Sequence, residues 1–367
     1  MELKLVDAKL LDLTKIKPFA FNLAGGGKAG AYECGALAAF AQIGVLENSE
    51  YIAGTSTGGL NTGTYSLWGG IEPGEDGNID LNIPQPWWAS VDVWEEIEKN
   101  SDIYKGSIGS GGIKGFFEGI GAGAGFLFGK RSILDPTPLY KKLDKIFGDI
   151  TLKEAAEKWK IDIILTAMDL NTTNETFFTS FNPDTQNIKL AEVLKATSGI
   201  PGVFRTVPVA YPLKLANGKV HWFVDGGLAA NNPFISCLKY NVAFPDKVVK
   251  KIIIIFCYPD EYTDTGLEIT GMEDDKEYKS YKSAILRSIP CMLNGSEQIA
   301  EMIINDKCKN SDYDVLAISP KETPGDPLDF SNVQKLIQDG YDAVAVEGKG
   351  WSYKDDAMIN IADFLKR

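Results

Sequence analysis

Histidine is almost absent from this sequence, which contains only His221. A metal site built from several histidine ligands is therefore excluded. The five cysteines are scattered and include no Cys-x-x-Cys pair: Cys34, Cys237, Cys257, Cys291 and Cys308. We therefore expect neither a disulfide framework nor a zinc site, and the cysteine pattern favours a reducing compartment such as the cytoplasm.

Positive charge is also in deficit, because 37 lysines and arginines face 50 aspartates and glutamates, which gives a net charge of −13. Such a chain should not bind the backbone of DNA or RNA through bulk charge, so no nucleic-acid partner is expected. Hydrophobic residues make up 44% of the chain and charged residues 24%. These fractions exclude a disordered or fibrous protein.

Long hydrophobic runs are missing as well. The longest candidate, Gly115 to Gly129, is too short to span a bilayer and carries Glu118. Residues 1–18 mix acidic with apolar residues, unlike the charged-then-apolar order of a signal peptide. We therefore expect a cytoplasmic protein that contacts membranes only at their surface.

What the sequence does contain is a repeated order of strand, glycine turn and helix. A strand at 18–24 leads through Gly25–Gly30 into a helix at 31–43, and a strand at 51–53 leads through Gly54–Gly59 into a helix at 60–67. That order is typical of a parallel α/β sheet. Later helices are expected at about 135–147 and 190–196, and later strands at 161–167, 176–179, 220–224 and 251–256.

No internal repeat or linker divides the chain, so we expect a single α/β domain over residues 1–367. Its core is expected at about 19–260, with an insertion at about 69–131. The part from about 280 to 367 is expected to be mainly helical.

Ser56 lies in the segment Gly54-Thr55-Ser56-Thr57-Gly58, which fits the pattern G-x-S-x-G. In that pattern the serine occupies a tight turn between a strand and a helix, and glycines let the backbone pass without a clash. The positive end of the following helix then lies close to the serine oxygen. Because the expected strand and helix flank this turn, we interpret Ser56 as a nucleophile rather than as part of a plain glycine turn.

The earlier loop, Gly25-Gly26-Gly27-Lys28-Ala29-Gly30, also joins a strand to a helix. It matches neither the Walker pattern nor a dinucleotide-binding G-x-G-x-x-G pattern with a suitable acid downstream. Consecutive glycines leave backbone N–H groups unobstructed, as an oxyanion hole requires. We interpret the loop as an oxyanion hole one strand away from Ser56, with a plain glycine turn as the alternative.

A serine nucleophile needs a base, and His221 is poorly placed to be one. It precedes Asp225, whereas the histidine of an α/β-hydrolase triad follows the acid. If residues 220–225 form one strand, His221 and Asp225 are about 13 Å apart, too far for a hydrogen bond. Asp225, which precedes two glycines at the end of that strand, is the favoured base.

In this order the motifs resemble those of patatin-like phospholipases, serine lipid acyl hydrolases with a Ser–Asp dyad. The matching segments are the loop 25–30, the turn 54–59, Asp225-Gly226-Gly227 followed by Asn231-Asn232-Pro233, and residues 196–204. The resemblance implies a three-layer α/β/α sandwich with a mainly parallel sheet and a cap or lid insertion. It also implies Ser56 as nucleophile, Asp225 as base, and Gly25, Gly26 and Gly27 as oxyanion donors.

The sequence departs from the family at the end of the first loop. The family usually has a basic residue directly before the last glycine, a position that is Ala29 here. Lys28 is therefore the candidate for the electrostatic role at the oxyanion hole. The alternative is an ordinary exposed lysine at the start of a helix.

The expected reaction is hydrolysis of acyl esters in a phospholipid or lysophospholipid, through an acyl-enzyme and without a metal or organic cofactor. Two alternatives remain open: acyl transfer to an acceptor other than water, and a catalytically silent interaction module. Bulky apolar residues alternate with glycines from Gly106 to Gly129, and basic residues flank them. This composition predicts a lid or a membrane-docking loop, the alternative being a long ordered loop packed on the core.

Overall fold

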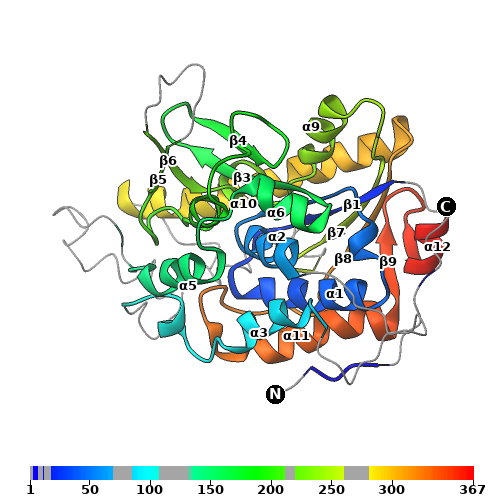
Figure 1. The fold of residues 1–367 in the computed structure, drawn as a ribbon, viewed down its shortest axis with the longest axis horizontal. Helices are drawn as coiled ribbons and strands as arrows, with labels where there is room; N and C mark the ends of the chain where they lie inside the picture. The colour runs from blue at the N-terminus through cyan, green and yellow to red at the C-terminus, as the bar shows by residue number, and fades with distance from the viewer. Residues whose placement is uncertain are drawn as a thin grey trace.

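The fold is that of an α/β protein built around one large mixed sheet (Figure 1). In this computed structural model the described residues are 3–6, 11, 18–68, 85–106, 132, 134–210, 220–259 and 281–367, without the side chains of 281–294. The strands follow the order β10-β9-β8-β7-β1-β2-β3-β6-β5, and β4 pairs with β3 outside that path.

Five neighbouring strands at the centre of the sheet are parallel, as the repeated glycine turns predict. They are β1 (Phe19–Leu23), β2 (Tyr51–Thr55), β3 (Asp162–Asp169), β7 (Lys251–Ile255) and β8 (Asp314–Ile318). The flanking strands run antiparallel to their neighbours: β4 (Asn174–Thr179), β5 (Val207–Ala210), β6 (Val220–Asp225), β9 (Lys349–Ser352) and β10 (Ala357–Asn360).

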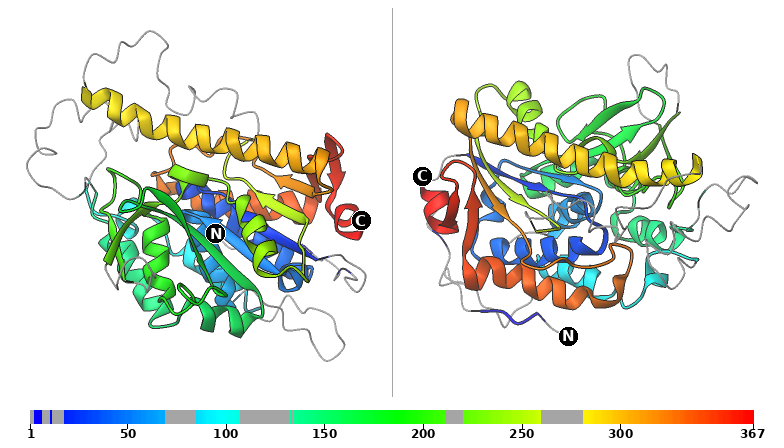
Figure 2. Two further views of the ribbon diagram at one scale, coloured as in Figure 1. Left: turned by 90° about the horizontal axis from the view of Figure 1, so that it is seen from above. Right: turned by 180° about the vertical axis from the view of Figure 1, so that it is seen from behind.

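Helices cover both faces of the sheet, so the architecture is the expected three-layer sandwich. Figures 1 and 2 show α1 and α11 on one face, and α9 with the long α10 on the other. The central strands are accordingly buried on both sides; the isoleucines of β7 have no exposed surface. Successive residues of β1 alternate between the two cores, with Phe19 and Phe21 in one and Ala20 in the other.

The helices begin and end close to the positions expected from the sequence. Those that the expectations covered are α1 (Gly30–Gln42), α2 (Thr57–Trp68), α5 (Thr137–Phe147) and α7 (Leu190–Thr197). The others are α3 (Trp88–Glu95), α6 (Leu152–Trp159), α8 (Gly227–Ala230), α9 (Ile235–Ala243), α10 (Tyr281–Asn310), α11 (Val333–Asp342) and α12 (Ile361–Lys366). No helix in the described ranges is long and apolar enough to cross a membrane.

The C-terminal part contributes more to the sheet than the expectation of a mainly helical segment allowed. Strand β8 pairs with β7 inside the parallel region, and β9 and β10 extend the sheet beyond it. The sheet therefore continues past residue 260, the expected end of the core. No glycine-rich turn follows β8, whereas such a turn marks the end of β1 and of β2.

The expected insertion is described only in part. Helix α3 and the residues up to Gly106 belong to the folded body, where Trp87 and Trp94 are buried. The remainder of the glycine-rich segment up to Gly129 lies outside the described residues, so the lid interpretation stays a prediction.

Candidate active site

Strand β3 brings the ends of two other strands together. β2 pairs with the first part of β3, placing Thr55 opposite Thr166, and β6 pairs with its last part, placing Asp225 opposite Ala167. β4 occupies the other edge of β3 over the same stretch, so β2 and β6 meet on one edge. The chain leaves β2 at Ser56, which therefore emerges beside Asp225.

The backbone at Ser56 is held in a sharp turn. Its φ is +55°, in the left-handed region that residues other than glycine seldom occupy. A Cβ at Gly54 would lie 2.3 Å from the carbonyl oxygen of Gly58, so the turn can close only around glycine. The Ser56 N–H donates to Thr197 Oγ1 at 2.9 Å, which fixes the turn against the end of α7.

Ser56 and Asp225 form a direct hydrogen bond. Ser56 Oγ donates to Asp225 Oδ2 at 2.6 Å, and the N–H of Gly227 donates to Asp225 Oδ1 at 2.8 Å. Burial raises the pKa of Asp225 to about 6, although both hydrogen bonds oppose this rise. The carboxylate is therefore ionised at neutral pH and is a stronger base than an exposed aspartate, as general-base catalysis requires.

The glycine loop lies against this pair and is anchored at three of its N–H groups. Gly25 donates to the carbonyl oxygen of Asn231 at 3.0 Å, Gly26 donates to Thr57 Oγ1 at 3.1 Å, and Lys28 donates to the carbonyl oxygen of Pro327 at 2.8 Å.

Gly27 differs from its neighbours in the loop. Its N–H has no acceptor among the residues that the structure describes, and it lines the same pocket as Ser56. Its φ is +59°, and a Cβ there would lie 2.2 Å from the Pro327 carbonyl oxygen, so the position suits only glycine. Of the four residues expected in an oxyanion hole, Gly27 is the one whose N–H is available to a ligand.

Lys28 is buried, contrary to the alternative of an exposed lysine at a helix start. Its Nζ lies 3.6 Å from the position that a Cβ at Gly325 would take. Lys28 is not among the residues that line the pocket beside Ser56. Any action on an oxyanion would therefore be electrostatic and at a distance.

An apolar pocket opens beside Ser56 and Gly27. Helices α2, α3 and α5 supply half of its lining residues. The others include Ser198, Ile200 and Phe204, and, far away in the sequence, Leu328 and Phe330. Of the wall residues outside the loop 25–30 and the turn 54–59, only those within 196–204 belong to a segment that the sequence motifs singled out, and that segment carried no prediction of a pocket. The apolar spacing of Leu139, Leu143 and Ile146 on α5 is a signal that could have indicated one wall.

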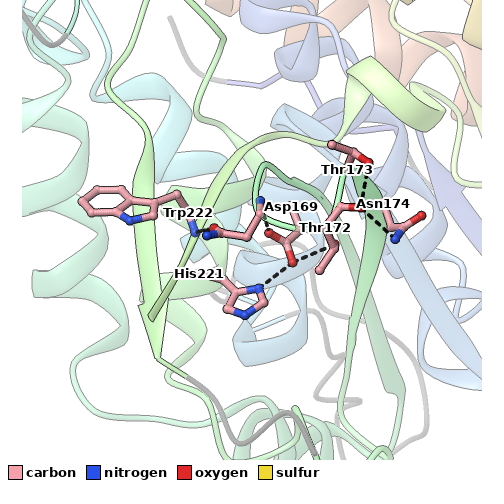
Figure 3. A network of polar contacts seen from close by, with 7 residues as sticks. Asp169, Thr172, Thr173, Asn174, His221 and Trp222 are labelled. Atoms are coloured by element: carbon pink, nitrogen blue, oxygen red, sulfur yellow. Dashed lines mark hydrogen bonds and ion pairs between the residues drawn. The ribbon is translucent and has the colours of Figure 1, made fainter. Parts of the chain in front are cut away.

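His221 belongs to a different polar network, drawn in Figure 3. Its Nδ1 lies 2.6 Å from Asp169 Oδ2, and Asp169 also accepts hydrogen bonds from the N–H of Asn171 at 2.8 Å and from Thr172 Oγ1 at 2.9 Å. The carboxylate partner of the histidine is thus Asp169, and that of the serine is Asp225. No local motif indicates the pairing of His221 with Asp169.

A family model described as patatin-like phospholipase matches residues 22–238, more than half of the chain and a range that includes Ser56 and Asp225. Among solved structures, that of VipD from Legionella pneumophila is similar with a TM-score of 0.37 and 13% sequence identity, covering 94% of this chain and 68% of that chain. No curated protein matches the chain.

Proposed function

The chain belongs to the patatin-like phospholipase family, and on that premise we propose that it hydrolyses acyl esters of lipids through Ser56 and Asp225. The observation that carries the proposal is the 2.6 Å hydrogen bond between Ser56 Oγ and Asp225 Oδ2 at the mouth of an apolar pocket. Substrates of this class are phospholipids or lysophospholipids, whose acyl chain suits such a pocket.

In the first half of the proposed reaction, Ser56 Oγ attacks the ester carbonyl carbon while Asp225 takes the hydroxyl proton. The carbonyl oxygen becomes an oxyanion, towards which the N–H of Gly27 donates. When this intermediate collapses, the bond to the alcohol oxygen breaks and the proton passes from Asp225 to the departing alcohol. The acyl group remains on Ser56 as an ester.

In the second half, water attacks the acyl-enzyme while Asp225 accepts a proton from it. The second tetrahedral intermediate collapses, Ser56 recovers its proton, and a fatty acid leaves. Because the water attacks the acyl carbon from the side that the alcohol has left, the carboxylate that protonated the alcohol is also placed to accept the proton of the water, and Asp225 serves both halves. No step requires a metal or an organic cofactor.

The apolar pocket supports a lipid acyl group rather than a small polar ester. Transfer of a methylene from water into an apolar site contributes about 0.8 kcal/mol, so even a chain of moderate length gains substantial binding energy there. The polar groups that a lipid carries beyond its ester would remain outside, near the loop and the turn.

The test is product analysis with a defined lysophospholipid, with and without an added alcohol acceptor. We expect the fatty acid as product, and a loss of at least about a thousandfold in rate for Ser56→Ala, since removal of a serine nucleophile has effects of this order or larger. The matched control is Ser66→Ala on the same helix, whose buried hydroxyl donates to the Gly63 carbonyl oxygen.

Three outcomes would contradict the proposal. If the main product with the acceptor present is the ester of the fatty acid with the added alcohol, the protein is a transferase. If no ester is turned over, the protein is a catalytically silent module. Retention of activity in Ser56→Ala to within tenfold would place the nucleophile elsewhere.

A further inference from the structure

One face of α2 leads from the nucleophile into the pocket. Ser56 directly precedes α2, and its carbonyl oxygen accepts a hydrogen bond from the Leu60 N–H at 3.1 Å. Leu60 and Thr64 follow at four-residue spacing on the helix, so the three residues lie in line, and all three border the pocket. With a rise of about 1.5 Å per residue, the eight residues from Ser56 to Thr64 span about 12 Å. The next position on this face, Trp68, packs against the core and is not part of the pocket.

The opposite wall comes from α5, where Leu139, Lys142, Leu143 and Ile146 line the pocket at helical spacing. Lys142 has a second role. Its Nζ lies 3.0 Å from Glu96 Oε2 and donates to the Val93 carbonyl oxygen at 3.3 Å. The lysine thus contributes to the apolar wall with its stem and joins α5 to α3 with its charged end.

The third wall is fixed by hydrogen bonds to Asn61 on α2. Trp94 Nε1 donates to Asn61 Oδ1 at 2.8 Å, and Thr64 Oγ1 donates to the Asn61 carbonyl oxygen at 3.0 Å. The indole and the hydroxyl therefore have partners within the protein. Since these polar groups are satisfied, the pocket offers an apolar chain no competing demand for a hydrogen bond.

We infer that this pocket binds a single acyl chain of limited length, with Thr64 and Lys142 as specificity-determining residues. The inference rests on the proposed function, because the chain is measured from Ser56. Carbon–carbon bonds of about 1.5 Å in a zigzag advance about 1.3 Å each, so a depth of about 12 Å accommodates about nine carbons beyond the carbonyl. The substrate class is an ester of a medium-length chain, and longer chains leave their ends outside the pocket.

The experiment measures kcat/KM for nitrophenyl esters with chains from two to sixteen carbons. For the unmodified protein we expect about a fourfold gain per methylene up to about ten carbons and no gain beyond, because only buried methylenes contribute. Thr64→Leu fills the deep end, and the loss of two methylene positions should lower the ratio of decanoate to butyrate activity by about sixteenfold. Ser66→Ala, on the same helix and outside the pocket, should leave the ratio unchanged.

Lys142→Ala tests the α5 wall of the pocket independently. Unlike Thr64→Leu, it removes side-chain volume and so places no larger side chain in the pocket. The variant loses the lysine methylenes and the ion pair with Glu96, so more methylenes of a long acyl chain can become buried. The ratio of kcat/KM for palmitate to that for decanoate should rise by about fourfold or more. Its matched control is Lys141→Ala, since Lys141 is exposed on the same helix and does not line the pocket.

The outcomes separate this inference from the proposed function. If no ester is hydrolysed, the proposed function itself fails. If short esters are hydrolysed but the profile of the unmodified protein keeps rising to sixteen carbons, the length limit is wrong. If the limit is present but neither Lys142→Ala nor a folded Thr64→Leu variant moves it, these residues do not set the specificity.

Discussion

Asp225 and Asp169 lie on the same pair of strands, but the pKa values of their carboxyl groups are shifted in opposite directions. Asp225 on β6 faces Ala167 on β3, and two positions along the same ladder Asp169 on β3 faces Phe223 on β6. Both carboxylates are buried, and each has a partner atom at 2.6 Å. Burial raises the pKa of Asp225 to about 6. Burial has the same tendency at Asp169, but hydrogen bonds from His221, the Asn171 N–H and Thr172 outweigh it and lower the pKa.

The difference lies in how the negative charge of each carboxylate is compensated, and it bears on the proposal that Asp225 is the base. Asp225 receives one hydroxyl and one backbone N–H, which leaves its negative charge incompletely compensated. Asp169 receives a backbone N–H, a hydroxyl and an imidazole that can carry charge. A carboxylate that is under-compensated takes up a proton more readily, so Asp225 is suited to activate Ser56 and Asp169 is suited to hold His221 in place.

The largest expected effect comes from comparing Asp225→Asn with Asp169→Asn. Loss of a general base should lower kcat/KM for a short nitrophenyl ester by about a hundredfold to ten thousandfold in Asp225→Asn. Asp169→Asn should retain activity within about threefold, because Asp169 lies outside the proposed reaction. Equal losses in two folded variants would remove the distinction between the carboxylates.

The pH dependence of activity should follow Asp225. Its ionised form acts as the base, so kcat/KM should rise with pH through about 6, and at pH 4 it should be about a hundredfold below its value on the plateau above pH 7. A histidine base would titrate in a similar range, since an ordinary histidine has a pKa near 6.5. The control is therefore His221→Gln, which should keep the same rising limb. Loss of that limb in His221→Gln would assign it to the imidazole.

The effect on stability should be smaller and opposite in sign for the two aspartates. The raised pKa of Asp225 means that the fold loses stability as the pH rises from about 4 to about 6 and carries the full cost at pH 7, so Asp225→Asn should leave Tm at pH 7 unchanged or higher. The lowered pKa of Asp169 means that its charge stabilises the fold above its unfolded pKa and ceases to do so as pH falls through the folded one.

For Asp169→Asn we therefore expect a loss of about 1–3 kcal/mol at pH 7, the cost of leaving buried donors without their acceptor. That difference from the unmodified protein should shrink as the pH falls below 4. Urea unfolding at pH 7 and at pH 3 measures the free energy of unfolding of each variant on both sides of this change. If Asp225→Asn and Asp169→Asn lose the same free energy of unfolding at pH 7, the expected difference between the two aspartates is wrong.

Local sequence patterns were sufficient to predict the central sheet and to single out Ser56 and Asp225, which the structure brings within hydrogen-bond distance. Ser56 and Asp225 each follow a strand and precede glycines, which is a signal contained within a few residues. The pairing of Asp169 with His221 depends instead on the register between β3 and β6, two strands about fifty residues apart. Register is set by tertiary packing and leaves no local trace.

The same limit applies to the C-terminal strands and to the pocket. β8 is identified by its position beside β7, not by a distinctive pattern of its own. The pocket combines α2, α3 and α5 with Leu328 and Phe330, segments that meet only in the folded chain. The anchoring of Gly25, Gly26 and Lys28, which leaves the Gly27 N–H as the available donor, likewise depends on contacts with distant residues.

The central claim is that Asp225, and no histidine, activates Ser56. The most direct measurement is the rate at which a fluorophosphonate labels the protein, with the modified residue identified by mass spectrometry. The account predicts that Ser56 is labelled at similar rates in the unmodified protein, in His221→Gln and in Asp169→Asn, and at least about a hundredfold more slowly in Asp225→Asn. Fast labelling of Ser56 in Asp225→Asn, together with slow labelling in His221→Gln, would contradict it.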